Sequence, residues 1–590
     1  MTDLKQWLPL SKKEIEIRGW NELDVVLISG DAYIDHPAFG TAIIGRTIEA
    51  EGYKVGIIAQ PNWRDDLRDF KRYGKPKLFF AITSGSMDSM VNHYTAAKRL
   101  RSTDAYTPGN VAGFRPDYAT IVYANIVKKL YPDSMIIIGG IESSLRRLTH
   151  YDYWSDTLKP SILIDSQADL LIYGMGEKPL KAILDVFKHH NKPNKSDFFH
   201  IPQIAYTTQE QIEKDENTLF LHSFQSCLKS KETFAHHFKL FEIESHKKHA
   251  KRLVEPNGDS FVVVNPPFEP LSTAELDSIY DLPFTRLPHP KYEKRGAIPA
   301  FVMIQNSVTI HRGCFGGCSF CAISAHQGKF IANRSQASIL KEIKKITQMP
   351  YFKGHISDLG GPSANMYNMQ GKDEQLCNRC SRPSCIFPNK CPNLNYNHQT
   401  LIDLYKQANS LPKIKKITIG SGIRYDMLIG NTKQANHSFK IDEYTELLIR
   451  NHISGRLKVA PEHTENHVLD LMRKPHFDQF LSFKQKFDSL NKKFHLNQQI
   501  VPYFISSHPA CSLTDMKILA KKVKQIGIQP EQVQDFTPTP MTLSSTIFYT
   551  GINPYTGQKV FCATRKAAKQ QQNNCFFDTT TTKKQDRTHL

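Results

Sequence analysis

The sequence predicts an α/β fold in two parts: a doubly wound, Rossmann-like domain over residues 1–190 and a partial (β/α)6 barrel of the TIM type over residues 300–560. Two observations predict it. In the first part, short apolar runs that end at glycine alternate with amphipathic helix patterns, as buried parallel strands and their crossover helices do. In the second part a strand–helix rhythm recurs six times, fewer times than in the eight-fold barrel.

The strands of the Rossmann-like domain are expected in five apolar runs. The first, DVVLISG, is apolar throughout and ends at Gly30, which is typical of a strand buried on both faces. Ligands of such domains bind beyond the carboxyl ends of the strands, so the loops after these runs are candidate ligand sites. The runs cover residues 24–30, 54–59, 75–83, 134–140 and 168–177.

The expected barrel strands each end in a glycine-rich or polar signature. Because barrels of this type place their chemistry at the carboxyl ends of the strands, these signatures predict one shared site. The strands are expected to begin at Ser307, His355, Lys416, Arg456, Gln498 and Gln532. The polar, lysine-rich residues 191–299 are expected to form a helical connector, and residues 561–590 a disordered tail.

Composition excludes several classes of protein. The N-terminus has no apolar core of a secretory signal and no run reaches the length of a membrane span, so we expect a cytoplasmic protein without membrane contact. Seven of the eleven cysteines lie between Cys314 and Cys391, a clustering that favours metal ligation over a disulfide scaffold. The net charge of +19 permits RNA as a partner, or reflects only a basic surface.

The first cysteine group is Cys314-x3-Cys318-x2-Cys321, directly after the first barrel strand. Three thiolates can bind three irons of a [4Fe-4S] cluster, leaving the fourth iron open to a small molecule. A closed zinc site would need a fourth ligand. The alternatives are a chance triplet or a zinc loop.

The second group is Cys377, Cys380, Cys385 and Cys391, in an insertion over residues 365–395. Four thiols at this spacing can close a site around zinc or an auxiliary [4Fe-4S] cluster. Prolines make the insertion irregular, so a metal would supply stability that it lacks. The alternative is four free thiols.

Several long motifs carry a resemblance to a known family. They include GGIESSLRRLTHYDYWSD, HRGCFGGCSFCAISAHQGK, SDLGGPSANMY and VAPEHTENHVLDLMRKP. Together they resemble the YgiQ family of radical S-adenosylmethionine (SAM) proteins from about residue 10 to residue 555. The resemblance implies a [4Fe-4S] cluster, SAM as cofactor, and an electron donor of the flavodoxin or ferredoxin type.

The resemblance also implies roles for residues at the strand ends. Gly360 and Gly361 match a glycine signature that meets the SAM amino group, although Pro362 replaces its usual glutamate. Ser421, Arg424 and Glu462 are candidates for contacts to the ribose or carboxylate of SAM, the alternative being helix caps.

The N-terminal domain resembles the cobalamin-binding domains of related enzymes. Its Asp35-His36 segment places the histidine one position earlier than the ligand motif of such domains does, which favours a degenerate domain that positions substrate or barrel over one that binds cobalamin.

The function expected from the sequence is therefore a radical SAM enzyme. It would cleave SAM reductively at the cluster and generate a 5′-deoxyadenosyl radical that acts on an unknown substrate. The alternatives are a non-catalytic iron–sulfur redox protein and a nucleic-acid-binding protein. Glycine-rich strand ends argue against the redox protein, which needs no SAM cradle.

Overall fold

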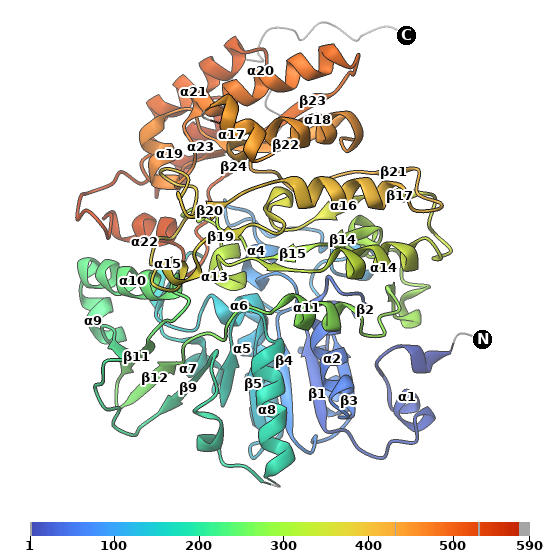
Figure 1. Cartoon of the computed structure of the whole chain (residues 1–590). Helices are drawn as coiled ribbons and strands as arrows, with labels where there is room; N and C mark the ends of the chain where they lie inside the picture. Colours follow the sequence, from blue (N-terminus) through green and yellow to red (C-terminus); the bar gives the residue numbers. More distant parts are fainter. Residues whose placement is uncertain (1–2, 191, 431, 529–531, 577–590) are drawn as a thin grey trace, which may run out of the picture.

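The computed structural model describes residues 3–190, 192–430, 432–528 and 532–576. It has an α/β fold, as the sequence predicts. In Figure 1 a large sheet, blue to green, forms the lower part of the molecule, and the α/β elements of the C-terminal half, yellow to orange, form the upper part. The segments that carry the cysteine groups lie between them, around α13 (Ile323–Gln327) and α15 (Glu374–Asn378).

The sheet has nine strands in the order β10-β11-β12-β9-β8-β5-β4-β1-β3. Its parallel part is formed by the five apolar runs expected from the sequence. These strands are β1 (Val25–Ser29), β3 (Val55–Ala59), β4 (Phe79–Thr83), β5 (Met135–Ile138) and β8 (Leu170–Ile172).

Helices cover both faces of this sheet because successive side chains of a strand point to opposite sides. Val25 and Leu27 of β1 belong to the core beneath α2 and α8. Val26 and Ile28 belong to the core beneath α5 and α7. The four helices are α2 (Gly40–Ala50), α8 (Glu177–His189), α5 (Ala119–Leu130) and α7 (Ile162–Ser166).

The expectation of a helical connector over residues 191–299 is wrong. The segment does contain α9 (Phe224–Lys229), α10 (Lys231–Ser245) and α11 (Thr273–Tyr280), but it also extends the sheet by four strands. The buried, charged Glu255 interrupts the apolar run that would have indicated strand β11. Its carboxylate accepts hydrogen bonds from Thr149 N and Oγ1 at 2.8 and 2.9 Å. The added strands are β9 (Ile204–Thr208), β10 (Thr218–Phe220), β11 (Arg252–Asn257) and β12 (Ser260–Val264).

The C-terminal half contains short parallel strands at the six expected places. The described pairings join β14 to β18, β17 to β21, and β22 to β23 to β24, all parallel. The strands are β14 (Ser307–Thr309), β17 (His355–Ile356) with β18 (Asp358–Gly360), β21 (Lys416–Ile417), β22 (Arg456–Glu462), β23 (Gln499–Ser506) and β24 (Gln532–Asp535).

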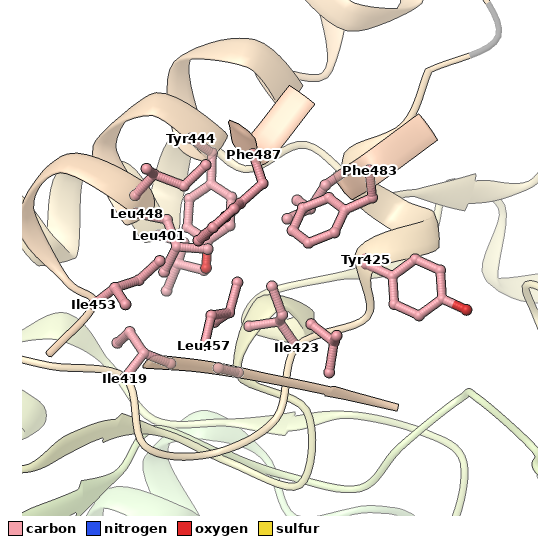
Figure 2. Packing of buried hydrophobic residues seen from close by; sticks show 14 of the residues in the cluster. Leu401, Ile419, Ile423, Tyr425, Tyr444, Leu448, Ile453, Leu457, Phe483 and Phe487 are labelled. Carbon is pink, nitrogen blue, oxygen red and sulfur yellow. The ribbon is translucent and has the colours of Figure 1, made fainter. Parts of the chain in front are cut away.

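Amphipathic helices between these strands bury one large core. Figure 2 shows Leu401, Tyr444, Leu448, Phe483 and Phe487 turned toward Leu457 of β22. Serine caps begin two of these helices: Ser335 caps α14, and Ser512 and Asp515 form a reciprocal capping box at the start of α21. The helices are α14 (Gln336–Ile346), α16 (Gln399–Asn409), α18 (Ile441–Asn451), α20 (Phe477–Lys493) and α21 (Leu513–Gln525).

The expected disordered tail is wrong for residues 561–576, where α23 (Lys566–Asn574) packs against α21. Gln572 is buried; it accepts a hydrogen bond from Ser507 N and donates one to Cys511 O, both at 2.8 Å. Residues 577–590 of that prediction lie outside the described residues. None of the described helices is long and apolar enough to cross a membrane.

Buried ion pairs join the two halves. Arg312 binds Glu177 at 2.5 Å, and Arg473 binds Glu242 at 2.7 Å. Because an unpaired buried charge is costly, these pairs fix the orientation of the cysteine-bearing loop over the carboxyl ends of the sheet strands.

Candidate functional site

The loop that carries the first cysteine group is closed at its base by a short antiparallel ladder. β15 (His311–Arg312) precedes the loop and pairs with β16 (Ala332–Asn333), which follows it. Gly313 has a φ of +89°, and a Cβ there would lie 2.4 Å from Phe330 O. Cys314 N donates to Gly328 O at 3.1 Å. Glycine is therefore required at the entry of the loop.

The three thiols of this loop are partly buried and influence one another. Burial, together with the neighbouring Cys318, raises the pKa of Cys321 to about 12. The same two causes raise the pKa of Cys314, which Arg424 and Lys474 partly offset. Thiols in such surroundings stay protonated unless a cation lies beside them. Bound iron would supply that positive charge, so the donor set fits an iron–sulfur cluster.

Arg424 lies beside this loop. Its Nη1 donates to Cys318 Sγ at 3.3 Å, while Nε and Nη2 hold both carboxylate oxygens of buried Asp426 at 2.9 and 2.8 Å. The sequence predicted Arg424 as a SAM contact, whereas its side chain contacts Cys318 and Asp426. Hydrogen bonds to cluster sulfur tune the potential of iron–sulfur centres.

Gly360 and Ser421 come together at the ends of β18 and β21. A Cβ on Gly360 would lie 2.1 Å from Ser421 Oγ. Asp358 Oδ1 accepts hydrogen bonds from Gly420 N, Ser421 N and Ser421 Oγ at 2.8 to 3.0 Å. One carboxylate thus fixes the loop after β21 against the glycine pair.

Gly361 packs against His311, a residue that the sequence analysis missed. A Cβ on Gly361 would lie 2.6 Å from Cε1 of the His311 ring. His311 is fully buried, and its ring lies beside the backbone of Ser363. Burial lowers the pKa of His311 to about 3, which keeps the ring neutral. Its place three residues before Cys314 was the available sequence signal.

Glu462 lies at the end of β22 in a left-handed conformation, with a φ of +69°. It is buried, and Lys474 Nζ lies 3.5 Å from Oε1. Burial raises the pKa of Glu462, and Lys474 partly offsets this. The charge of Glu462 also raises the pKa of Cys321, so this residue faces the cysteine loop.

The second cysteine group packs directly on the first loop. Cys385 N donates to Phe315 O at 3.0 Å, and a Cβ on Gly317 would lie 2.2 Å from Pro383 O. Phe315 shares a small buried core with Met366, Met369, Ile386, Leu394 and Met427. The insertion thus has an apolar core, but one built around a residue of the first loop.

The four thiols of the insertion lie near one another. Burial raises the pKa of Cys385 to about 11; Lys329 lowers it in part, and the neighbouring Cys380, Cys391 and Cys377 contribute to the rise. Across the described residues, no three histidine, cysteine or acidic side chains are already gathered in a geometry that could hold a metal ion.

Lys329 lies beside these thiols without an acidic partner. Its side chain is buried and donates to Arg382 O at 2.8 Å and Cys380 O at 3.3 Å, with Cys380 Sγ at 3.8 Å. No carboxylate forms an ion pair with it in the part of the chain that the structure describes.

The segment compared with a cobalamin ligand motif is covered by the chain itself. β2 (Ile34–Asp35) pairs with β13 (Leu287–Pro288), and the Asp35 carboxylate accepts from Thr285 N at 2.9 Å. His36 is buried, and its Nδ1 accepts from Ala38 N at 3.0 Å. A buried His36 held in this way does not fit the role of a histidine ligand to the cobalt of a corrin.

A family model described as Radical SAM N-terminal matches residues 7–307. Proteins named UPF0313 protein from Porphyromonas gingivalis and Bacteroides thetaiotaomicron are each 56% identical over 96% of this chain, covering 89% and 93% of their own lengths.

Two solved structures give looser matches. The methyltransferase TsrM from Kitasatospora setae, with cobalamin and a [4Fe-4S] cluster bound, is 13% identical with a TM-score of 0.46, covering 88% of this chain and 77% of that one. The cobalamin-dependent enzyme OxsB is 12% identical with a TM-score of 0.47, covering 88% of this chain and 54% of that one.

Proposed function

The chain belongs to the UPF0313 family of radical SAM proteins, and from this premise we propose that it is an enzyme that cleaves SAM reductively. Cys314, Cys318 and Cys321 would hold a [4Fe-4S] cluster. The observation that carries the proposal is that one glycine-bounded loop carries three partly buried thiols and that the Arg424 guanidinium donates to one of them, Cys318. We interpret the N-terminal sheet as a Rossmann-like domain and the six strands as a partial (β/α)6 barrel.

When bound by Cys314, Cys318 and Cys321 and reduced, a [4Fe-4S] cluster would supply the electron for the reductive cleavage of SAM. The residues of this chain bind and orient. The backbone at Gly360 and Gly361 would receive the SAM amino group, and Asp358 would hold the Ser421 loop for the ribose. The Arg424–Asp426 pair adds no net charge but directs one donor at Cys318.

Anaerobic reconstitution followed by measurement of methionine and 5′-deoxyadenosine tests the proposal. With dithionite, or with a flavodoxin- or ferredoxin-type donor, we expect both products in equal amounts. A reconstituted cluster that never cleaves SAM would favour the alternative of a redox protein. Because the surroundings of His36 do not fit a corrin ligand, no step through cobalamin is proposed.

Replacement of Gly361 by valine tests the SAM cradle. The new side chain must displace the buried His311 ring, so we expect SAM affinity to fall about tenfold or more, ~1.4 kcal/mol. Calorimetric titration with SAM measures this. Gly40→Val is the control, because a Cβ at Gly40 meets nothing within 4 Å. Unchanged SAM affinity in Gly361→Val would show that the cradle lies elsewhere.

We also propose that Cys377, Cys380, Cys385 and Cys391 bind one metal centre, zinc or an auxiliary [4Fe-4S] cluster. Four thiolates around either metal carry net negative charge. That charge would compensate Lys329, whose burial without a carboxylate is otherwise costly. The centre would also order the insertion against the first cysteine loop through Phe315.

A further inference from the structure

Two consecutive arginines of the N-terminal domain have opposite surroundings. Both are buried, at 1% exposure for Arg146 and 3% for Arg147. Arg146 is ion-paired with Asp88. Arg147 has no acidic partner among the described residues; its Nη1 donates to Ser144 O, and its buried Nε has no described hydrogen-bond partner. A buried cation without a counter-ion costs stability. A bound anion would supply the counter-charge that Arg147 lacks.

Arg147 stands in the wall of a cavity. Its guanidinium carbon lies 4.7 Å from the ring centre of Tyr173 and 4.9 Å from that of Phe241. The two aromatic rings stabilise the planar guanidinium, and its N–H groups remain available as hydrogen-bond donors to a ligand. Burial with no carboxylate nearby lowers the pKa of Arg147 to about 10, so the guanidinium is still charged at neutral pH.

The cavity encloses about 150 Å³ and lies between the carboxyl end of β8 and the loop that follows the first cysteine group. Its charged lining is mainly basic. Lys178, Lys247 and Lys248 line it already paired with glutamates, whereas Arg147, Lys251 and Lys329 have no carboxylate partner among the described residues. Apolar surface comes from Phe268, Phe330 and Pro266. An anion with an apolar body matches this lining.

The cavity adjoins the cysteine loop. A smaller cavity lined by Cys318 and Cys321 shares the walls Phe241, Ser245, Ser324 and Ala325 with it. A molecule held at Arg147 would thus be separated from the cluster cysteines by one layer of side chains.

We propose that this cavity binds the substrate of the enzyme, a small molecule that carries a phosphate or carboxylate, and that Arg147 holds this oxyanion through its planar fork. The inference rests on the proposed function for the role of the bound molecule. Such a site explains why a cation is buried here at a cost in stability: the ligand supplies the missing counter-charge.

Calorimetric titration of the reconstituted full-length protein with phenyl phosphate and with benzoate tests the proposal and distinguishes the two anions. We expect at least one probe to bind, and Arg147→Met to weaken its binding by roughly tenfold to a hundredfold, the value of a hydrogen bond to a charged group. Arg147→Lys, which keeps the charge without the fork, should be intermediate. Arg68→Met, at an arginine whose side chain is 74% exposed, should bind like the wild type.

The thermal midpoint without probe separates a binding role from a structural one. Removing an uncompensated buried cation should leave the midpoint of Arg147→Met unchanged or higher. A lower midpoint with unchanged probe binding would assign Arg147 to the fold and overturn the proposal, as would wild-type protein that binds neither probe. If Arg147→Met does not fold, the probe affinity of Arg147→Lys decides.

SAM cleavage measured in parallel separates the cavity proposal from the proposed function. Cleavage without anion binding overturns only the cavity proposal, and anion binding without cleavage overturns only the proposed function.

Discussion

Simultaneous replacement of Cys314, Cys318 and Cys321 by alanine is expected to abolish SAM cleavage. The variant should lose the broad visible absorption of a [4Fe-4S] cluster and about four irons per chain. The structure gives the reason: the three thiols come from one closed loop, and no other cysteine is on that loop. Iron analysis, the absorption spectrum and the yield of 5′-deoxyadenosine measure the effect.

The control is Cys562→Ala. Cys562 Sγ contacts Ile547 O at 3.4 Å, and the residue is not part of the cysteine loop, so its replacement should leave cluster and cleavage intact. A triple variant that keeps both its iron and its SAM cleavage would refute the central assignment. The fold should survive the triple replacement, because the β15–β16 ladder and the Arg312–Glu177 pair do not involve the thiols.

The parts of the fold that follow local patterns could be predicted from the sequence. The six predicted strands of the C-terminal half, and the five strands β1, β3, β4, β5 and β8 of the sheet, lie where the sequence pattern indicated them. The four strands β9 to β12 could not be predicted in this way. Glu255 interrupts the apolar pattern of β11, and its carboxylate is accommodated by two distant residues, Thr149 and His237. Likewise α23 has no apolar stripe and depends on Gln572 filling a polar gap beside Ser507.

The candidate site also has a part that local sequence patterns predict and a part that only the fold shows. The cysteine spacings are local and identified both candidate centres. His311 could have been recognised from its place three residues before Cys314. Lys329 and Arg147 could not be recognised as functional candidates from the sequence, because what distinguishes each is the absence of a carboxylate partner among the described residues. A buried lysine or arginine without a carboxylate can be seen only when every element packed around it is known. Arg146 and Arg147 are adjacent and chemically identical, yet only the fold shows that one of them is paired.

The second large effect is expected at the insertion. In the background that lacks Cys314, Cys318 and Cys321, the protein should retain about one zinc, or a residual iron–sulfur signal, per chain. Further replacement of Cys377 and Cys380 by serine should release this metal and make residues 365–395 sensitive to protease. The insertion has only a small apolar core, which it shares with Phe315. Loss of the metal would also leave Lys329 without its counter-charge, so the insertion should lose stability.

Lys329→Met provides an independent test of that second centre. If the four thiolates surround a metal, removal of Lys329 leaves their negative charge uncompensated, and the metal should be lost more readily to a chelator while thiol accessibility rises. If the cysteines are free thiols, Lys329→Met only removes a buried unpaired cation, and the thermal midpoint should rise or stay unchanged. Metal analysis together with thiol titration distinguishes the two cases. A metal-free, folded protein with all four thiols titratable before any replacement would show that the insertion is held by its apolar core and by its contacts to the first loop alone.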